Sequence, residues 1–195
     1  MSTLTLWRSP VGAGALTIAT MLLQTPALGA PPTRFTADAS FESAGGCVAS
    51  DVFVFVDNGR IKDKGARGQA VITLVETDEC VDEILLQAVG KANLKADELQ
   101  VAPDLSSATL TSRIRLRDAI SKNSIDLDLD LTWQAVEPPT VSMTNVEVEE
   151  PGQIVRLDRR ATRTLRSAEA AGSIVAQGKD FAPEPATEAT LGSTR

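Results

Sequence analysis

The sequence predicts an all-β fold: an antiparallel β-sandwich or a closed β-barrel in a single domain. First, apolar and polar residues alternate with a period of two along most of the chain, which is the period of a half-buried strand. Second, turn signals recur about every 8–14 residues, a spacing typical of sandwiches and barrels. Third, helical patterns are few, and strands with one wet face favour antiparallel over parallel pairing.

The N-terminal half of the domain is expected to contain strands at 34–41, 47–56 and 70–77. Gly45-Gly46 ends the first of these, and Asp57–Gly59 predicts a turn after the second. The charged, glycine-containing stretch 60–68 is interpreted as a loop. Valines alternate with Phe53 and Phe55 in 47–56, which predicts a strand covered on both faces.

Residues 83–89 are interpreted as a further strand. A helix remains an alternative here, because Ile84–Leu86 could begin one and 91–99 is rich in helix-forming residues.

The clearest unit is an antiparallel hairpin over residues 108–133. Its apolar positions share one face: Ala108, Leu110, Ser112, Ile114, Leu116, Ile125, Leu127, Leu129, Leu131 and Trp133. The opposite face carries charge. One allowed register places Arg117, Arg115 and Arg113 across from Asp126, Asp128 and Asp130, as a solvated salt ladder.

The C-terminal part continues the β pattern after Pro138-Pro139. Strands are expected at 141–149 and 154–159, with Pro151-Gly152 as the turn between them. Residues 161–178 are interpreted as β, either continuous or interrupted by a bend at Ala170–Gly172. The stretch 183–195 is rich in Thr, Ala and Ser and is expected to be a disordered tail, so that the β domain spans 30–182.

Residues 1–29 are interpreted as a cleavable signal peptide. A single positive charge, Arg8, precedes an apolar run that is too short to span a membrane, and Ala27 and Gly29 are the small residues before the cut. No later apolar stretch is long enough to span a bilayer as a helix, so no membrane insertion is expected after cleavage. The predicted location is therefore secreted or extracytoplasmic.

Cys47 and Cys80 are the only cysteines in the sequence. An even number of cysteines in an exported chain predicts a disulfide. A pair of buried free thiols is the alternative.

Composition excludes several classes of function. The full chain has a formal net charge of −7, and because 1–29 contains only Arg8 the mature chain has −8. That sign argues against a nucleic-acid partner. Histidine is absent, which excludes Ser-His-Asp and Cys-His catalysis and removes the commonest zinc ligand. No cofactor is expected.

Two acidic groups are candidate sites. Asp126, Asp128 and Asp130 invite a calcium interpretation, although carboxylates two residues apart on a strand are about 7 Å from one another. Five acids lie around Cys80: Glu76, Asp78, Glu79, Asp82 and Glu83. A carboxylate pair among them could hydrolyse glycosides, and solvated loop charge is the simpler interpretation.

The only basic cluster is a possible patch for an anionic partner. It comprises Arg156, Arg159, Arg160 and Arg163, with Arg166 close by. Such a run could bind an acidic or phosphate-bearing ligand, or could be a solvated face that balances nearby carboxylates.

Four segments resemble uncharacterised secreted bacterial all-β proteins. They are Phe35–Asp57, with its Gly45–Val48 run, then Asp126–Trp133, and the C-terminal stretches Arg166–Ile174 and Asp180–Pro185. The resemblance covers about 34–185. It implies bacterial export and an all-β domain, and it brings no activity and no functional residues.

The sequence therefore favours a secreted, non-enzymatic β domain that acts as a binding or structural module with an unknown protein or surface partner. A hydrolase that uses acidic residues alone is the alternative. A calcium-dependent adhesion or lectin-like module is the third possibility.

Overall fold

A computed structural model describes residues 34–61, 65–150 and 153–195. The regular elements among them are all strands, which confirms the predicted all-β class. Their bounds are β1 Arg34–Gly45, β2 Val48–Ile61, β3 Gly65–Asp78, β4 Glu83–Leu94, β5 Leu99–Val101, β6 Ser107–Asp118, β7 Ser124–Ala135, β8 Thr140–Glu150, β9 Gln153–Ala176, β10 Lys179–Asp180 and β11 Glu188–Thr194. Within these ranges the chain forms no helix that could cross a membrane. The predicted signal peptide lies outside the described residues.

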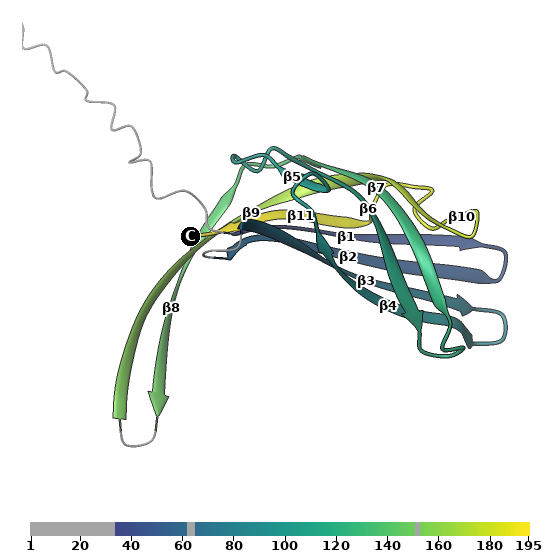
Figure 1. Ribbon diagram of the computed structural model, residues 1–195, viewed down its shortest axis with the longest axis horizontal. Coiled ribbons are helices and arrows are strands. Elements are labelled where there is room, and N and C mark those ends of the chain that lie inside the picture. Colours follow the sequence, from purple (N-terminus) through teal and green to yellow (C-terminus); the bar gives the residue numbers. More distant parts are fainter. Residues whose placement is uncertain (1–33, 62–64, 151–152) are drawn as a thin grey trace, which may run out of the picture.

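The strands close into an antiparallel ring (Figure 1). Its order is β9–β11–β1–β2–β3–β4–β6–β7, and β7 returns to β9. The weakest join is β4 to β6, where only Ala88–Asp118 and Val89–Arg117 pair. Beyond it β5 pairs with β6 instead. One antiparallel sheet thus accounts for the whole fold, as the alternation predicts.

The core fills the inside of the ring. Along the central part of most ring strands, buried residues alternate with exposed or half-buried ones, because successive side chains of a strand point to opposite faces. Trp133 is fully buried, and its indole Nε1 donates to the Asp38 carbonyl at 2.9 Å. The hydrogen bond links β7 to β1 across the core, since these two strands are not neighbours in the ring.

The predicted turn at Asp57–Gly59 is wrong, and so is the predicted loop where 60–61 and 65–68 are strand; its residues 62–64 lie outside the described residues. β2 continues to Ile61, and its Gly59 pairs with Arg34 on one side and Arg67 on the other. Ladder bonds to two neighbours satisfy the backbone there, which outweighs the turn preference of the local residues. The expected cover on both faces of β2 is also wrong, since Phe53 is 43% exposed.

β4 settles the choice between strand and helix at 83–94 in favour of the strand. Gly90 is required there by close packing, because a Cβ on it would lie 2.3 Å from Leu116 Cδ2 and 2.8 Å from the Arg115 carbonyl oxygen. A side chain at this position would push β4 away from β6 at their narrow join.

β9 joins the strands expected at 154–159 and 161–178 into one. It runs without a break from Gln153 to Ala176. Of the two alternatives for 161–178, the continuous strand is the one observed. Gly172 has a φ of +145°, and its ideal Cβ would lie 2.0 Å from the Asp130 carbonyl oxygen. The predicted Pro151-Gly152 turn lies outside the described residues.

The first half of β9 leaves the ring together with β8. These two strands pair with each other and extend away from the ring as a two-stranded arm (Figure 1). We call β8 and residues 153–162 of β9 the arm. The half of the arm nearest the ring is its root, and the half beside 150–153 is its tip.

The disordered tail expected at 183–195 is wrong. Residues 188–194 form β11, which lies between β1 and β9 and completes the ring. Leu191 is fully buried, and Ala189 and Ser193 face the same interior. Thr, Ala and Ser dominate this segment, but ladder bonds on both sides and the buried Leu191 order it.

Candidate functional site

The charged face of the β6–β7 hairpin forms a ladder, in a register two residues away from the expected one. Arg115 pairs with Asp126 at 2.8 Å and Arg113 with Asp128 at 3.4 Å, measured from Nε to Oδ1. Thr111 Oγ1 donates to Asp130 at 3.4 Å. Arg117 stands opposite Ser124, so the expected pair with Asp126 does not form.

The five-residue connection between β6 and β7, residues 119–123, sets this register. Asp118 is buried, and its carboxylate accepts hydrogen bonds from the backbone N–H groups of Ile120 and Ser121 at 3.0 and 2.9 Å. It also accepts from the Gln87 N–H of β4 at 3.3 Å and from the Ser121 hydroxyl. These donors hold the pKa of Asp118 well below its usual range, with the Ser121 hydroxyl as the largest cause. Sequence reasoning missed this residue, although it continues the inward-facing alternation of 108–116.

The three aspartates of the calcium hypothesis are therefore each bound to a neighbour on β6. Arg115 lowers the pKa of Asp126 through its hydrogen bond and charge. Among the described residues, the aspartates do not form a group close enough to share one ion. An open hollow of about 410 Å³ lies beside two of them on the outer face, lined by Thr111, Ser112, Arg113, Asp128, Leu129, Asp130, Ser173 and Val175.

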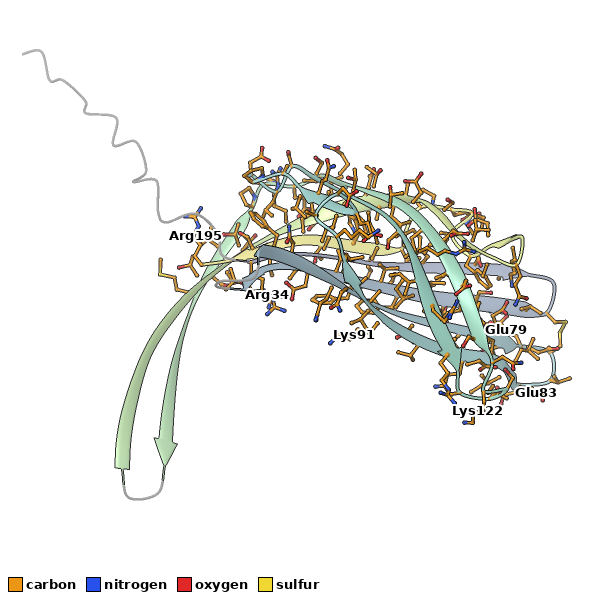
Figure 2. The ribbon with its side chains drawn as sticks, viewed as in Figure 1. Arg34, Glu79, Glu83, Lys91, Lys122 and Arg195 are labelled. Carbon is orange, nitrogen blue, oxygen red and sulfur yellow. A yellow bond between two sulfur atoms is a disulfide. The ribbon has the colours of Figure 1, made fainter. Side chains whose placement is uncertain are left out.

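The disulfide Cys47–Cys80 is present, as predicted, and joins the β1–β2 turn to the β3–β4 turn. Asp78 accepts a hydrogen bond from the Cys80 N–H at 2.9 Å. Ligand atoms of Cys47, Asp78 and Cys80 lie within 4.8 Å of one another, but the two sulfurs are bonded together and offer no thiolate to a metal. Figure 2 shows Glu79 and Glu83 at this end of the ring, opposite the end where Arg34 and Arg195 lie.

Glu76 is not part of the acidic surface around Cys80, because its side chain points into the ring at the end that carries the disulfide. It shares the inward alternation of Ala70, Ile72 and Leu74, and it forms an ion pair with Lys179. The buried Ser50 donates to the Glu76 carboxylate at 3.2 Å.

Lys179 belongs to β10, and its Nζ lies 4.7 Å from the ring centroid of the buried Phe181. The segment after β9 is thereby held over the end of the ring. Sequence reasoning missed Lys179, which follows the β segment expected at 161–178 and has no predicted role.

The arm carries the predicted basic patch, arranged along its length. Arg159 and Arg160 pair with Val146 and Asn145 in the root half, and Arg156 lies further out. Arg163 pairs with Ser142 at the base of the arm, next to the ring. Arg163 is exposed, and the side chains of the other three lie outside the described residues. Acidic residues occupy the opposite half: Glu149 pairs with Ile154 and Glu150 with Gln153.

The arm is firmly attached at its root. Arg166 is half-buried and donates from Nε to the Glu137 carbonyl at 2.8 Å and from Nη1 to the Asp104 carbonyl at 3.3 Å. Ser167 Oγ donates to the Glu137 carboxylate at 3.0 Å. β9 itself continues from the arm into the ring, where it pairs with β7 and β11.

Comparisons with known proteins found no family model and no curated protein that matches this chain. Among solved structures, a similar one is a crystal structure of a protein named "putative AttH" from Nitrosomonas europaea. The TM-score is 0.42 at 11% identity over 83% of this chain. The chain spans about half the length of that protein, of which 50% is covered.

Proposed function

We propose that the mature protein is a secreted, non-enzymatic binding or structural module of a bacterial envelope or medium, and that the arm is its binding element. The signal-like residues 1–29 and the disulfide Cys47–Cys80 support the location. The resemblance to secreted bacterial proteins supports the source.

The open strand edges of the arm are the main reason to propose it as the binding element. β8 and residues 153–161 of β9 have only each other as strand partners among the described residues, so both outer edges of the arm offer unpaired N–H and C=O groups. Natural proteins avoid such edges unless they use them, because an open edge is a template for pairing with another chain. The arginines Arg156, Arg159, Arg160 and Arg163 add a preference for an anionic partner.

The enzyme alternative has less support. An acid catalyst near neutral pH needs a raised pKa. Where the structure resolves a carboxyl pKa shift, at Asp104, Asp118 and Asp126, the shift is downward. Glu76, an inward carboxylate at the disulfide end of the ring, forms an ion pair with Lys179.

The proposal is tested by shortening the arm. Met143 and Thr162 are Cα partners, so an Asn-Gly turn can replace 144–161 and close the two strands. The probe is immobilised poly-L-glutamate at low ionic strength. We expect the mature protein to bind it, and the shortened variant to bind at least ~10-fold more weakly with an unchanged Tm.

A variant with Ala at Arg156, Arg159, Arg160 and Arg163 should lose binding in the same way. The matched control replaces Arg113 and Arg115 by Ala, because these arginines are exposed on the ring. Binding by the shortened variant, equal loss in the control, or no binding by the wild type would contradict the proposal.

A further inference from the structure

The arm is an incomplete sheet, which raises the question of what completes it. An isolated two-stranded hairpin is marginally stable in water, and a third strand is usually needed. The β9 portion of the arm, at ten residues, would extend about 30 Å at the usual strand rise. Its β8 strand also exposes apolar side chains, since Val141 is 58% and Met143 82% exposed.

The charges of the arm are separated along its axis. The root half and the base of the arm hold Arg159, Arg160 and Arg163 beside one acidic residue, Asp158. The tip half holds Glu147, Glu149 and Glu150 beside one arginine, Arg156, so the root is net positive and the tip net negative. Across 140–163 the four arginines of the patch are balanced by these glutamates and Asp158, so the net charge is zero. The arm is therefore complementary to another arm that runs in the opposite direction.

We infer that the arm binds the arm of a second copy of this chain, with the two β8 strands antiparallel about a two-fold axis near Asn145. The inference rests on the proposed function and names the partner. This arrangement lays the acidic tip of each copy along the basic root of the other. It also forms a four-stranded sheet, β9–β8–β8–β9, in which both β8 edges are paired.

The alternatives within the same pair of arms are less favourable. Parallel pairing would bring tip to tip and root to root, so like charges would face each other. Antiparallel pairing through the two β9 edges would bring arginine-rich segments together and leave the exposed Val141 and Met143 on open β8 edges. A two-fold contact through β8 avoids both costs.

The decisive experiment uses two charge-reversed variants of the mature protein. One carries Glu147→Arg, Glu149→Arg and Glu150→Arg, and the other carries Arg159→Glu, Arg160→Glu and Arg163→Glu. Residues 140–163 then have a net charge of +6 in the first variant and −6 in the second, so each variant should self-associate at least ~10-fold more weakly than wild type. Mixed together they should form a 1:1 heterodimer, because each interface regains opposite charges.

Native mass spectrometry and sedimentation velocity are the measurements, at low and high ionic strength. Matched controls make the same charge changes elsewhere: Glu79→Arg, Asp82→Arg and Glu83→Arg at the disulfide end, and Arg113→Glu, Arg115→Glu and Arg117→Glu on the ring. These should dimerise as wild type does. Circular dichroism of each variant checks that it folds.

A cysteine scan gives an independent measurement, since the sequence has no cysteine besides Cys47 and Cys80. Thr144→Cys or Asn145→Cys should form a disulfide-linked dimer, and Thr109→Cys on the exposed face of β6 should not.

Three outcomes overturn the inference. The first is a wild-type protein that remains monomeric at about 100 μM and low salt. The second is a pair of charge-reversed variants that do not form a heterodimer when mixed. The third is a control variant that weakens association as much as the arm variants do. If the protein is monomeric but still binds poly-L-glutamate through the arm, the inference falls and the proposed function stands.

Discussion

At the residue scale, two carboxylates that face the inside of the ring are compensated by different kinds of partner. A charge on the inner face of a ring needs compensation. Glu76 meets a lysine from another element, whereas Asp118 accepts hydrogen bonds from backbone N–H groups and a hydroxyl. Asp118 thereby ties the β6–β7 connection to β4 at the narrow join of the ring.

Asp118 predicts a specific pH dependence. The pKa of Asp118 is lower in the folded protein than in the unfolded chain, where it is about 4. The ionised carboxylate therefore stabilises the fold at pH values above about 4. This stabilisation is lost as the pH falls through the pKa of the folded protein. Asp118→Asn should lower Tm at pH 7, and the difference from wild type should shrink towards pH 2. Thermal unfolding at several pH values measures this.

The control for this prediction is Asp130→Asn on the outer face of β7, where a single hydroxyl is the partner. It should change Tm little at every pH. A pH-independent deficit in Asp118→Asn would show that shape rather than charge makes the contribution.

At the element scale, β11 decides whether the ring closes. It supplies the only strand between β1 and β9 among the described residues. Without it two long strands would present open edges, and the inner faces of both would be uncovered. β11, a strand of mostly small and polar residues, is thus as necessary for closure of the ring as the leucine-rich hairpin β6–β7.

A pair of substitutions in β11 tests its role. Leu191→Ala should lower the free energy of unfolding by about 2–5 kcal/mol, the usual cost of truncating a buried leucine. Glu188→Ala, at an exposed position of the same strand, should change it by less than about 0.5 kcal/mol. Urea unfolding of the mature protein measures both, and equal small effects would mean that β11 is not part of the cooperative unit.

At the scale of the whole molecule, the two ends of the ring differ. One end is stapled by Cys47–Cys80 and covered by the segment that Lys179 and Phe181 hold in place. The arm leaves from the other end (Figure 1). A constrained body with a projecting arm fits a module that binds with the arm and uses the ring as its support.

The disulfide and the export prediction are tested together by intact mass. The exported protein should begin at Ala30, because cleavage is predicted after Gly29, and its mass should be two hydrogens below that of the reduced chain. Cys47→Ser with Cys80→Ser should lower the free energy of unfolding by about 2–4 kcal/mol through the greater entropy of the unfolded chain. Two free thiols in exported protein would contradict the prediction.

Local patterning by itself determined the fold class, the disulfide pair and the inward face of β6 and β7. These follow from the strand period, from cysteine count and from burial of every second residue, all of which a single chain displays. Only the tertiary structure decided that Asp57–Gly59 is strand, that Leu191 lies in a ring strand, and that Glu76 meets Lys179. Each of these depends on partners distant in sequence, because ladder bonds and burial from neighbouring strands override local turn and composition preferences. The arm belongs to the second kind: its strands were predicted, but their departure from the ring and their open edges exist only in three dimensions.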